Sequence, residues 1–316
     1  MATLATAADT EPRAGRAPGR RRVTVAKRRQ YRAAYILVLP FFVIFVAMII
    51  VPLAYAGYLS FFREQLVGGV SFAGLDNYSR AFHDKAFLSG VARMALFLVV
   101  QVPIMLALSL FFALALDSGM VRLSKFVRLG IFVPYAVPAV VATLMWGYLY
   151  GPDFGPFAQL AELLGLPAPP FLAPGTVLFS IINVVNWEFV GYNMIILYAA
   201  LRSVPVEMYE AAEVDGANQF RVAWSIKIPA IRQALILTVI FSIIGSFQLF
   251  NEPNLLYNLA PNAIGKDFSP NLYAYNVAFQ NQDVNYAAAI AFLLGIVIMI
   301  LSFTVQTLIN RQEAKS

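Results

Sequence analysis

Five stretches of this chain run for about 20 residues each without Asp, Glu, Lys or Arg. A helix needs roughly 20 predominantly apolar residues to cross the hydrocarbon core of a bilayer, so each stretch is long enough to span one. The five stretches are Tyr35–Phe62, Met94–Leu116, Leu129–Pro152, Gln233–Asn251 and Val284–Asn310. A sixth, Thr176–Leu201, is equally apolar apart from Glu188 near its centre. The sequence therefore predicts an all-α membrane protein with six transmembrane helices.

Composition agrees with this fold class and excludes several kinds of chemistry. Hydrophobic residues make up 60% of the chain and charged residues only 13%, whereas about 25% of residues are charged in soluble domains. Cysteine is absent and His83 is the only histidine, which excludes thiolate nucleophiles, disulfides and most transition-metal sites. The chain contains neither a GxxxxGK[ST] loop nor a GxSxG elbow. We therefore expect no enzyme activity, no metal and no cofactor of its own.

The distribution of positive charge predicts the orientation. The net charge is +6, but nine of the 23 Lys and Arg residues lie in residues 1–34, a Gly/Pro/Ala-rich stretch without apolar periodicity. This pattern indicates a flexible basic tail that anchors the topology and contacts anionic membrane lipid, and it argues against a nucleic-acid partner. The tail, the C-terminus and the loops on their side of the membrane together hold 18 basic residues, whereas the loops on the opposite side hold four. The positive-inside rule therefore predicts cytoplasmic termini, including residues 311–316, around one transmembrane domain at 35–310.

The loop at residues 203–229 interrupts this apolar pattern. Ser203 and Pro205 offer an N-cap and an early helical proline, and Val206 to Val214 is strong helix-forming sequence. Asp215-Gly216 stops this helix, because glycine readily adopts the left-handed conformation that closes a last turn. Asn218 can cap a second helix that runs to Ile228. The loop is therefore predicted to form a helix, a sharp turn and a second helix.

The first predicted helix of the loop carries a ridge of like charge. Glu207, Glu210 and Glu213 follow one another at intervals of three residues. Ala211 and Ala212 beside them leave room for a second surface to approach the backbone. This combination fits docking into a basic groove of a partner, although a solvated surface helix would have the same composition.

The spacing within this loop resembles a known motif. Glu210-Ala211-Ala212 is followed by three residues, Gly216, nine residues, Ile226, one residue and Ile228-Pro229. This arrangement resembles the EAA loop of binding-protein-dependent ABC importer permeases, whose usual form ends in Ile-x-Leu-Pro. The resemblance implies a type I importer permease bundle whose loop is a cytoplasmic coupling helix in a groove of the ATPase subunit. The residues that it assigns to ATPase coupling are Glu210, Ala211, Ala212, Asp215, Gly216, Ile226 and Pro229.

Two further segments resemble one branch of that family. Ser71–Phe87, which contains Gly-Leu-Asp-Asn-Tyr, is similar to the segment after the first span in carbohydrate-uptake permeases of the maltose type. Phe132–Tyr150 is similar to their third span. Where the family often has Asn-Thr, this chain has Ala92-Arg93, so no role is carried over to that position. The branch implies a saccharide as the transported substrate.

Polar residues within spans four and five are candidates for substrate binding, since such residues usually face the protein interior or a water-filled path. The resemblance places Trp187, Tyr192 and Ser246 near the sugar. Polarity alone adds Asn186, Glu188, Gln248, Asn251 and Glu252, and for Glu252 the alternative is a marker of the membrane edge. Hydrogen bonding between helices is the alternative for the polar members.

These features favour a permease subunit of an ATP-driven ABC importer for sugars or oligosaccharides in a bacterial cell membrane. The resemblance implies three partners: a second permease, an ATPase dimer that binds the ATP, and an extracytoplasmic sugar-binding protein. The alternative is the same machine for glycerol-phosphate or a polyamine. An intramembrane hydrolase or lipid transferase would need an acid/base constellation, and Glu188 is nearly alone within the spans. An ion channel would have no use for the acidic loop.

Overall fold

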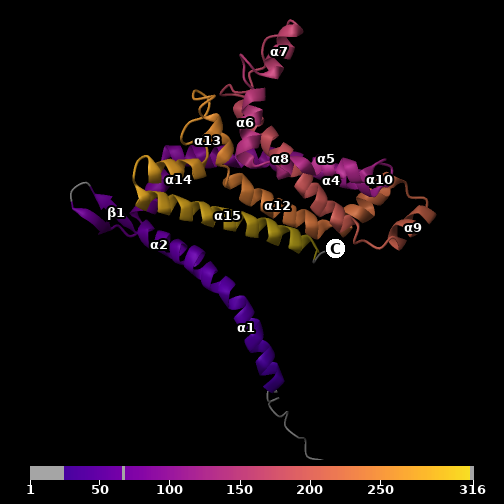
Figure 1. Cartoon of the computed structure of the whole chain (residues 1–316), viewed down its shortest axis with the longest axis horizontal. Coiled ribbons are helices and arrows are strands. Elements are labelled where there is room, and N and C mark those ends of the chain that lie inside the picture. The colour runs from indigo at the N-terminus through magenta and orange to yellow at the C-terminus, as the bar shows by residue number, and fades with distance from the viewer. Residues whose placement is uncertain (1–24, 66–67, 314–316) are drawn as a thin grey trace, which may run out of the picture. The chain divides into compact units, whose positions relative to one another are not determined.

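The computed structural model describes residues 25–65 and 68–313 (Figure 1). It divides into two compact units, one up to Tyr55 and the other from Ala56 onward. Helical structure in the first unit begins at Val25, so the end of the tail that the sequence predicts to be flexible is helical instead. The rest of that predicted tail, residues 1–24, lies outside the described residues. The elements that begin in the first unit are α1 (Val25–Phe45), the π-helical η1 (Val46–Ile50) and α2 (Val51–Ser60).

Among the described residues, five helical segments are long and apolar enough to cross a membrane, and a sharply bent pair makes a sixth. This agrees with the predicted number of spans. The long segments are Gln30–Ser60, α4 (Lys85–Asp117), α8 (Val177–Leu201), Arg232–Leu256 and α15 (Val284–Glu313). Several begin or end outside the predicted apolar windows, because a helix continues for one or two turns beyond the apolar stretch that identifies it.

The predicted third span is not one straight helix. α5 (Ser124–Phe132) and the 3-10 helix η2 (Val133–Ala136) turn by 96° into α6 (Ala139–Leu149), and Figure 1 shows α6 leaving the direction of α5. Pro138 lies at the bend, where Val137 before it is extended, as a residue preceding proline favours. Pro138 also has no N–H to continue a helix. Pro134 and Pro138 lie within the apolar Leu129–Pro152 window, but a window chosen by apolar content does not reveal a change of direction at proline.

The predicted fifth span is also interrupted. α12 (Arg232–Phe247) ends before Gln248, three residues are not α-helical, and α13 (Asn251–Leu256) then begins. Pro253 lies in the first turn of α13, where a missing N–H costs no helical hydrogen bond. Polar residues thus stand at a break in the helix rather than along an unbroken span.

Helices α4, α8 and α12 pack together in the second unit, and α15 packs on α12 (Figure 1). One core cluster joins these helices to α13 through buried residues that include Met94, Phe97, Ile181, Phe247 and Leu256. A separate cluster fixes the other end of α4 and α8 through Leu116, Leu197 and Leu201. These contacts hold the broken helices against the straight ones.

Shorter elements lie in the connections of the second unit. Phe62 pairs with Phe72 in an antiparallel hairpin, which the all-α prediction did not include. The Asp-Asn-Tyr part of the Ser71–Phe87 segment begins a helix, whose amphipathic face buries Asn77 and Ala81. These elements are β1 (Phe62–Gln65), β2 (Gly69–Phe72), α3 (Asp76–His83), α7 (Pro156–Leu163) and α14 (Pro270–Phe279).

Candidate functional site

One face of α8 carries three polar residues, Glu188, Tyr192 and Asn193. Val185, Glu188 and Tyr192 follow at intervals of three and four, and Phe189 and Asn193 extend the same stripe. A polar stripe on a membrane-spanning helix is stable only against other protein or a water-filled space. Here the stripe faces a cavity of about 460 Å³.

Four other parts of the second unit complete the cavity wall. Gln101 of α4 lies on one side, Tyr135 comes from η2, and Ser242 and Ser246 come from α12. Gln248, Asn251 and Glu252 belong to the break between α12 and α13 and the first turn of α13. The full lining is Gln101, Tyr135, Val137, Ala139, Val185, Glu188, Phe189, Tyr192, Asn193, Phe241, Ser242, Gly245, Ser246, Gln248, Leu249, Phe250, Asn251 and Glu252.

Both helix breaks therefore meet at one cavity. The bend before α6 contributes Tyr135, Val137 and Ala139, and the break after α12 contributes 248–250. Non-helical backbone at membrane depth leaves N–H and C=O groups without helical partners, so it is tolerated where it is buried in protein or lines a water-filled space. Discontinuous helices around a central cavity are a common way to build a substrate site in a transporter.

The cavity combines an aromatic wall with amides and carboxylates. Tyr135 and Tyr192 are stacked with ring centroids 4.6 Å apart and an angle of 21° between the planes. Gln101 donates from Nε2 to Asn186 Oδ1 at 3.2 Å, which fixes its amide at the wall. Ser246 donates its hydroxyl to Ser242 O at 2.7 Å, so its oxygen keeps capacity to accept. These groups offer stacking and hydrogen bonding to a polar ligand.

The cavity lining includes some of the predicted substrate residues and leaves out others. Those that line it are Glu188, Tyr192, Ser246, Gln248 and Asn251. Asn186 is behind the wall, bonded to Gln101, which is the interhelical alternative considered for it. Trp187 packs edge-to-face on Trp146 of α6, with ring centroids 5.9 Å apart, and does not line the cavity.

Sequence reasoning missed Gln101 and Tyr135 and undervalued Glu252. Gln101 is the one amide in the otherwise apolar Met94–Leu116 window, a signal that could have been used. Tyr135 lies between two prolines, Pro134 and Pro138, which could have marked a break. Glu252 is 93% buried in the cavity wall and so is no simple marker of the membrane edge.

The 203–229 loop forms a helix, a turn and further helical segments. The first helix ends at Val214 and is followed by a turn in which Gly216 has a φ of 79°, as the sequence predicts. Asn218 accepts from Arg221 N at 2.8 Å and caps the next helix, also as predicted. Ser203 does not cap the first helix, because its hydroxyl donates to Ala200 O at the end of α8. The helical elements are α9 (Glu207–Val214), α10 (Gln219–Val222), the π-helical η3 (Ala223–Lys227) and α11 (Ile228–Ala230).

The loop presents most of its motif residues outward. Glu207, Glu210, Ala211, Asp215, Gly216 and Pro229 are exposed, and Ala212 and Ile226 are half-buried. Of the predicted acidic ridge, the side chain of Glu213 lies outside the described residues. The exposed part of α9 therefore combines two carboxylates with small residues.

A buried ion pair ties the loop to the end of α4. Lys227 Nζ lies 2.6 Å from Asp117 Oδ2, and the two side chains are 8% and 4% exposed. The Lys227 ammonium also lies 4.8 Å from the centre of the Tyr209 ring on α9. Partial burial and the negative charge of Asp117 raise the pKa of the Tyr209 hydroxyl. Lys227 thus connects α9, η3 and α4.

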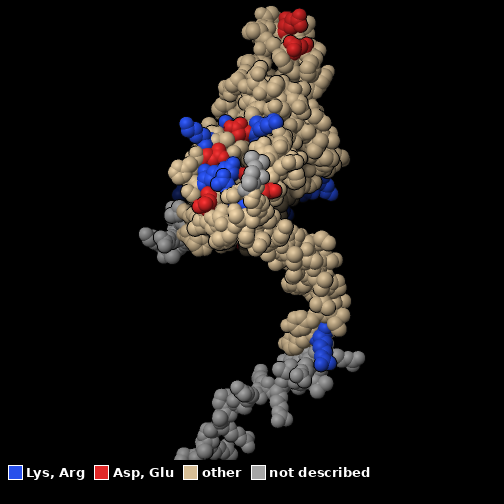
Figure 2. Space-filling model, turned by 90° about the vertical axis from the view of Figure 1, so that its left-hand side faces the viewer, with Lys and Arg blue, Asp and Glu red and all other residues tan. Residues whose placement is uncertain are grey.

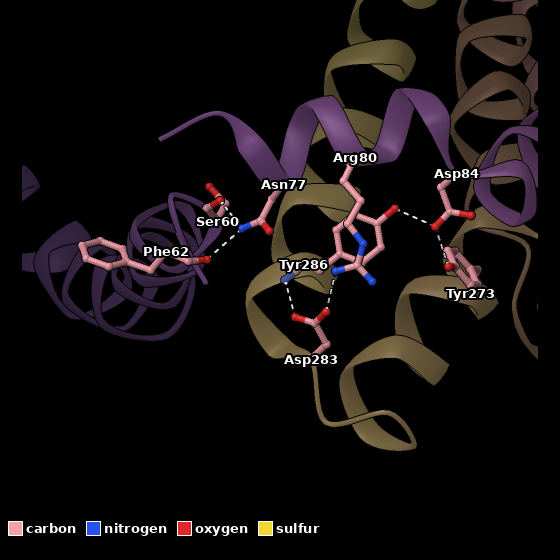
Figure 3. Close-up of polar contacts among 8 residues, drawn as sticks. All are labelled: Ser60, Phe62, Asn77, Arg80, Asp84, Tyr273, Asp283 and Tyr286. Carbon is pink, nitrogen blue, oxygen red and sulfur yellow. Dashed lines mark hydrogen bonds and ion pairs between the residues drawn. The ribbon is translucent and has the colours of Figure 1, made fainter. Parts of the chain in front are cut away.

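A second polar network holds α3 against α14 and α15 (Figure 3). Asp84 accepts from the hydroxyls of Tyr273 and Tyr286 at 2.6 and 2.7 Å, and it also caps α4 through Ala86 N and Phe87 N. Partial burial opposes ionisation of Asp84, but these hydrogen bonds outweigh it and hold its pKa below the ordinary value.

The neighbouring charged side chains extend this network to the surface. Arg80 pairs with Asp283 at 2.8 Å and lies over the Tyr286 ring, 3.7 Å from its centre. Asn77 donates to Ser60 O and Phe62 O at 2.9 and 2.8 Å. Figure 2 shows Lys and Arg beside Asp and Glu on the face that carries α3, β1 and α14. The charges there largely neutralise one another.

Several membrane-length helices, two of them interrupted at a polar cavity, define a multi-pass membrane transport protein. Residues 81–315 match the family described as binding-protein-dependent transport system inner membrane component. The chain belongs to this family, the permease subunits of ABC importers that work with a binding protein.

Relatives and a solved structure agree with this assignment. The arabinooligosaccharides transport system permease protein AraP of Bacillus subtilis is 30% identical to this chain. The match covers 85% of this chain and 86% of the length of AraP. The diacetylchitobiose uptake system permease protein NgcF of Streptomyces coelicolor is 31% identical, covering 76% of this chain and 71% of its own. A crystal structure of a bacterial alginate ABC transporter, in complex with an alginate pentasaccharide-bound periplasmic protein, shares the fold. Its TM-score is 0.80 at 18% identity, with 92% of this chain and 98% of that chain covered.

Proposed function

We propose that this chain forms half of the membrane pathway of an ABC importer for saccharides and that the cavity between α8, α12 and the two helix breaks is its substrate site. The observation that carries this proposal is the meeting of both helix breaks at one polar, aromatic cavity. An aromatic face can stack on a pyranose ring, and amides and carboxylates can bind its hydroxyls. The names of the AraP and NgcF relatives support a saccharide as the cargo.

The proposed machine contains three kinds of partner. A second permease completes the pathway, an extracytoplasmic binding protein delivers the saccharide, and two ATPase subunits bind and hydrolyse ATP. The 203–229 loop docks on an ATPase subunit through Glu210, Ala211, Ala212, Asp215 and Gly216, with Ile226 and Pro229 completing the motif. The exposure of Glu210, Asp215 and Gly216 and the left-handed turn at Gly216 support this role.

Uptake by the reconstituted importer tests the transport proposal. The chain is co-purified with the second permease, the ATPase and the binding protein, and it is placed in vesicles with a panel of labelled oligosaccharides. We expect ATP-dependent accumulation of at least one neutral saccharide. Accumulation of a polyamine with no saccharide would instead favour the second candidate, a cationic solute, for which the two buried carboxylates Glu188 and Glu252 are the specific support.

The orientation can be tested directly because the chain has no native cysteine. Asn218 and Asn262 are both exposed, so Asn218→Cys and Asn262→Cys are matched labelling sites. The charge distribution predicts that an impermeant thiol reagent added to intact cells labels Asn262→Cys and leaves Asn218→Cys unlabelled. The reverse pattern would place the loop and the termini outside the cytoplasm.

The coupling role is tested at the turn. An added Cβ at Gly216 meets no atom within 4 Å, so a substitution there acts through the backbone and not through a clash. Gly216→Val opposes the left-handed conformation and should lower substrate-stimulated ATP hydrolysis while the membrane-spanning part still folds. Wild-type hydrolysis and co-purification of the ATPase in this variant would contradict the docking proposal. The control is Ala217→Ser, a half-buried residue beside the turn and outside the motif.

A further inference from the structure

The cavity wall contains two acidic side chains. Glu188 of α8 and Glu252 of α13 are 4% and 7% exposed, so each is more than nine-tenths buried. Among the described residues that line the cavity, none is Lys, Arg or His. Lys227, a buried basic residue elsewhere in the second unit, is paired with Asp117 and does not line the cavity.

One of the two carboxylates is incompletely hydrogen-bonded. Glu188 Oε2 is buried and has no hydrogen-bond partner among the described residues, although Glu188 lines the cavity. Nearly all buried polar atoms in folded proteins have such a partner, and an ionised carboxylate can only accept hydrogen bonds. Glu188 is therefore a carboxylate that a hydrogen-bond donor in the cavity would satisfy.

The aromatic part of the cavity wall favours a ligand with a flat ring. The stacked Tyr135 and Tyr192 rings form a flat aromatic surface, and Tyr192 follows Glu188 by one helical turn on the same face of α8. A ring that stacks on Tyr192 would therefore lie within about one helical turn of Glu188. Hydroxyl groups and ammonium groups on that ring can donate to the carboxylate, whereas carboxylate and phosphate groups cannot.

We propose that this cavity selects saccharides by charge: it accepts hydroxyl- or ammonium-bearing rings and excludes rings that carry a carboxylate or phosphate. This inference rests on the proposed function. The physical basis is that like charges repel strongly where water is scarce, and an anion would also leave Glu188 Oε2 without a donor. Discrimination thus comes from a repulsive feature as well as an attractive one.

The test compares three labelled forms of one saccharide that the importer accumulates: the neutral form, an amino form and a uronate form. Uptake is measured per assembled complex with the same binding protein throughout. Any selectivity of the binding protein therefore cancels when variants are compared with wild type. The variants are Glu188→Gln, Glu252→Gln and the double variant, which keep side-chain volume and remove charge. The control is Glu162→Gln, an exposed carboxylate of α7 outside the cavity.

We expect wild type to take up the neutral and amino forms and to reject the uronate. In the double variant, the ratio of amino to neutral uptake should fall and the ratio of uronate to neutral uptake should rise, each by about tenfold, as expected for a change of one charged hydrogen bond. Glu162→Gln should leave both ratios at the wild-type value. The single variants give the direction of each change if the double variant does not assemble.

Three results are decisive against one claim or the other. Wild-type uptake of the uronate equal to that of the neutral form overturns the charge selection and leaves the proposed function intact. The charge selection is also overturned if the amino-to-neutral and uronate-to-neutral uptake ratios of all the assembled variants stay within about twofold of wild type. Uronate uptake that is undetectable in wild type and in every variant counts as an unchanged ratio. Failure of every saccharide to accumulate instead removes the proposed function itself.

Discussion

Two carboxylates of this chain, Asp84 and Glu188, differ in how far the protein itself satisfies them. Asp84 accepts two tyrosine hydroxyls and two backbone N–H groups, so both of its oxygens are bonded. Glu188 is more deeply buried, yet its Oε2 has no partner among the described residues. The first arrangement fixes α3, α4, α14 and α15 in place. The second leaves one acceptor without a partner among the described residues, as expected of a carboxylate at the proposed substrate site.

The Asp117–Lys227 ion pair is far more buried than the Arg80–Asp283 pair, and breaking it should have the largest effect. Lys227→Met removes the partner of a buried carboxylate, which typically costs about 3–5 kcal/mol. We expect a large fall in the melting temperature of the purified complex. The double variant Asp117→Leu/Lys227→Met should recover most of the loss, since no buried charge is then left alone. A single variant as stable as wild type would show that water reaches Asp117.

Asp84→Asn tests the closed network directly and should rank second. The amide keeps the shape but loses the charge that strengthens bonds from Tyr273 and Tyr286, so we expect a loss of about 1.5–3 kcal/mol. The matched control is Asp76→Asn, an exposed acid in the first turn of α3. Equal melting temperatures for the two variants would remove Asp84 from its structural role.

The same network predicts a pH dependence. The pKa of Asp84 is below its ordinary value of 3.8, so its stabilising effect is complete above that value and is lost as pH falls through the lower, folded-state pKa. The difference in melting temperature between wild type and Asp84→Asn should be constant above about pH 5 and should shrink in more acidic buffer. A difference that grows on acidification would have the wrong sign for this explanation.

Asp283→Asn should have a smaller effect, although it also breaks an ion pair. Arg80 and Asp283 have side chains that are 46% and 29% exposed, and pairs of this kind contribute about 0–1 kcal/mol. The amide oxygen can still cap α15 in place of Asp283 Oδ1, which accepts from Tyr286 N at 3.1 Å. Melting curves at low and high salt measure the effect, which added salt should reduce. A loss as large as that of Asp84→Asn would mean that the surface pair carries the network.

Glu188→Gln should have the smallest effect on stability. Its Oε2 has no hydrogen bond to lose, and the amide removes a buried charge, so we expect the melting temperature to be equal to or above that of wild type. A clear loss of stability or of assembly yield would show that Glu188 is a partner of another helix. The contrast with Asp84 would then disappear.

The sequence was a good guide wherever one segment determines the result. The apolar continuity of Thr176–Leu201 predicted α8 almost to the residue, and the turn at Gly216 followed from the residues on either side of it. The bend before α6 was not predicted, because a window count responds to polarity and not to direction. The short hairpin after α2 was missed for the same reason, since it adds no apolar run.

The candidate site was harder to predict because it is assembled from distant segments. Tyr135 and Tyr192 are stacked although 57 positions separate them, and only the packing of η2 on α8 brings them together. Polarity identified Glu188 correctly as a cavity residue, but it could not tell which way the neighbouring Trp187 would turn. One step along a helix rotates a side chain by about 100°, which was enough to send Trp187 to Trp146 instead.

The bend between α5 and α6 gives the cavity a mechanical property. Tyr135 lies in η2, at the bend between helices α5 and α6, while Tyr192 belongs to the continuous helix α8. A rotation of α5 or α6 about this bend would change the distance between the Tyr135 and Tyr192 rings, and with it the aromatic surface available to a ligand. The distance between the Tyr135 and Tyr192 rings therefore depends on the angle between α5 and α6. A spectroscopic distance measurement between these two positions would report a change in that angle without any label on the transported substrate.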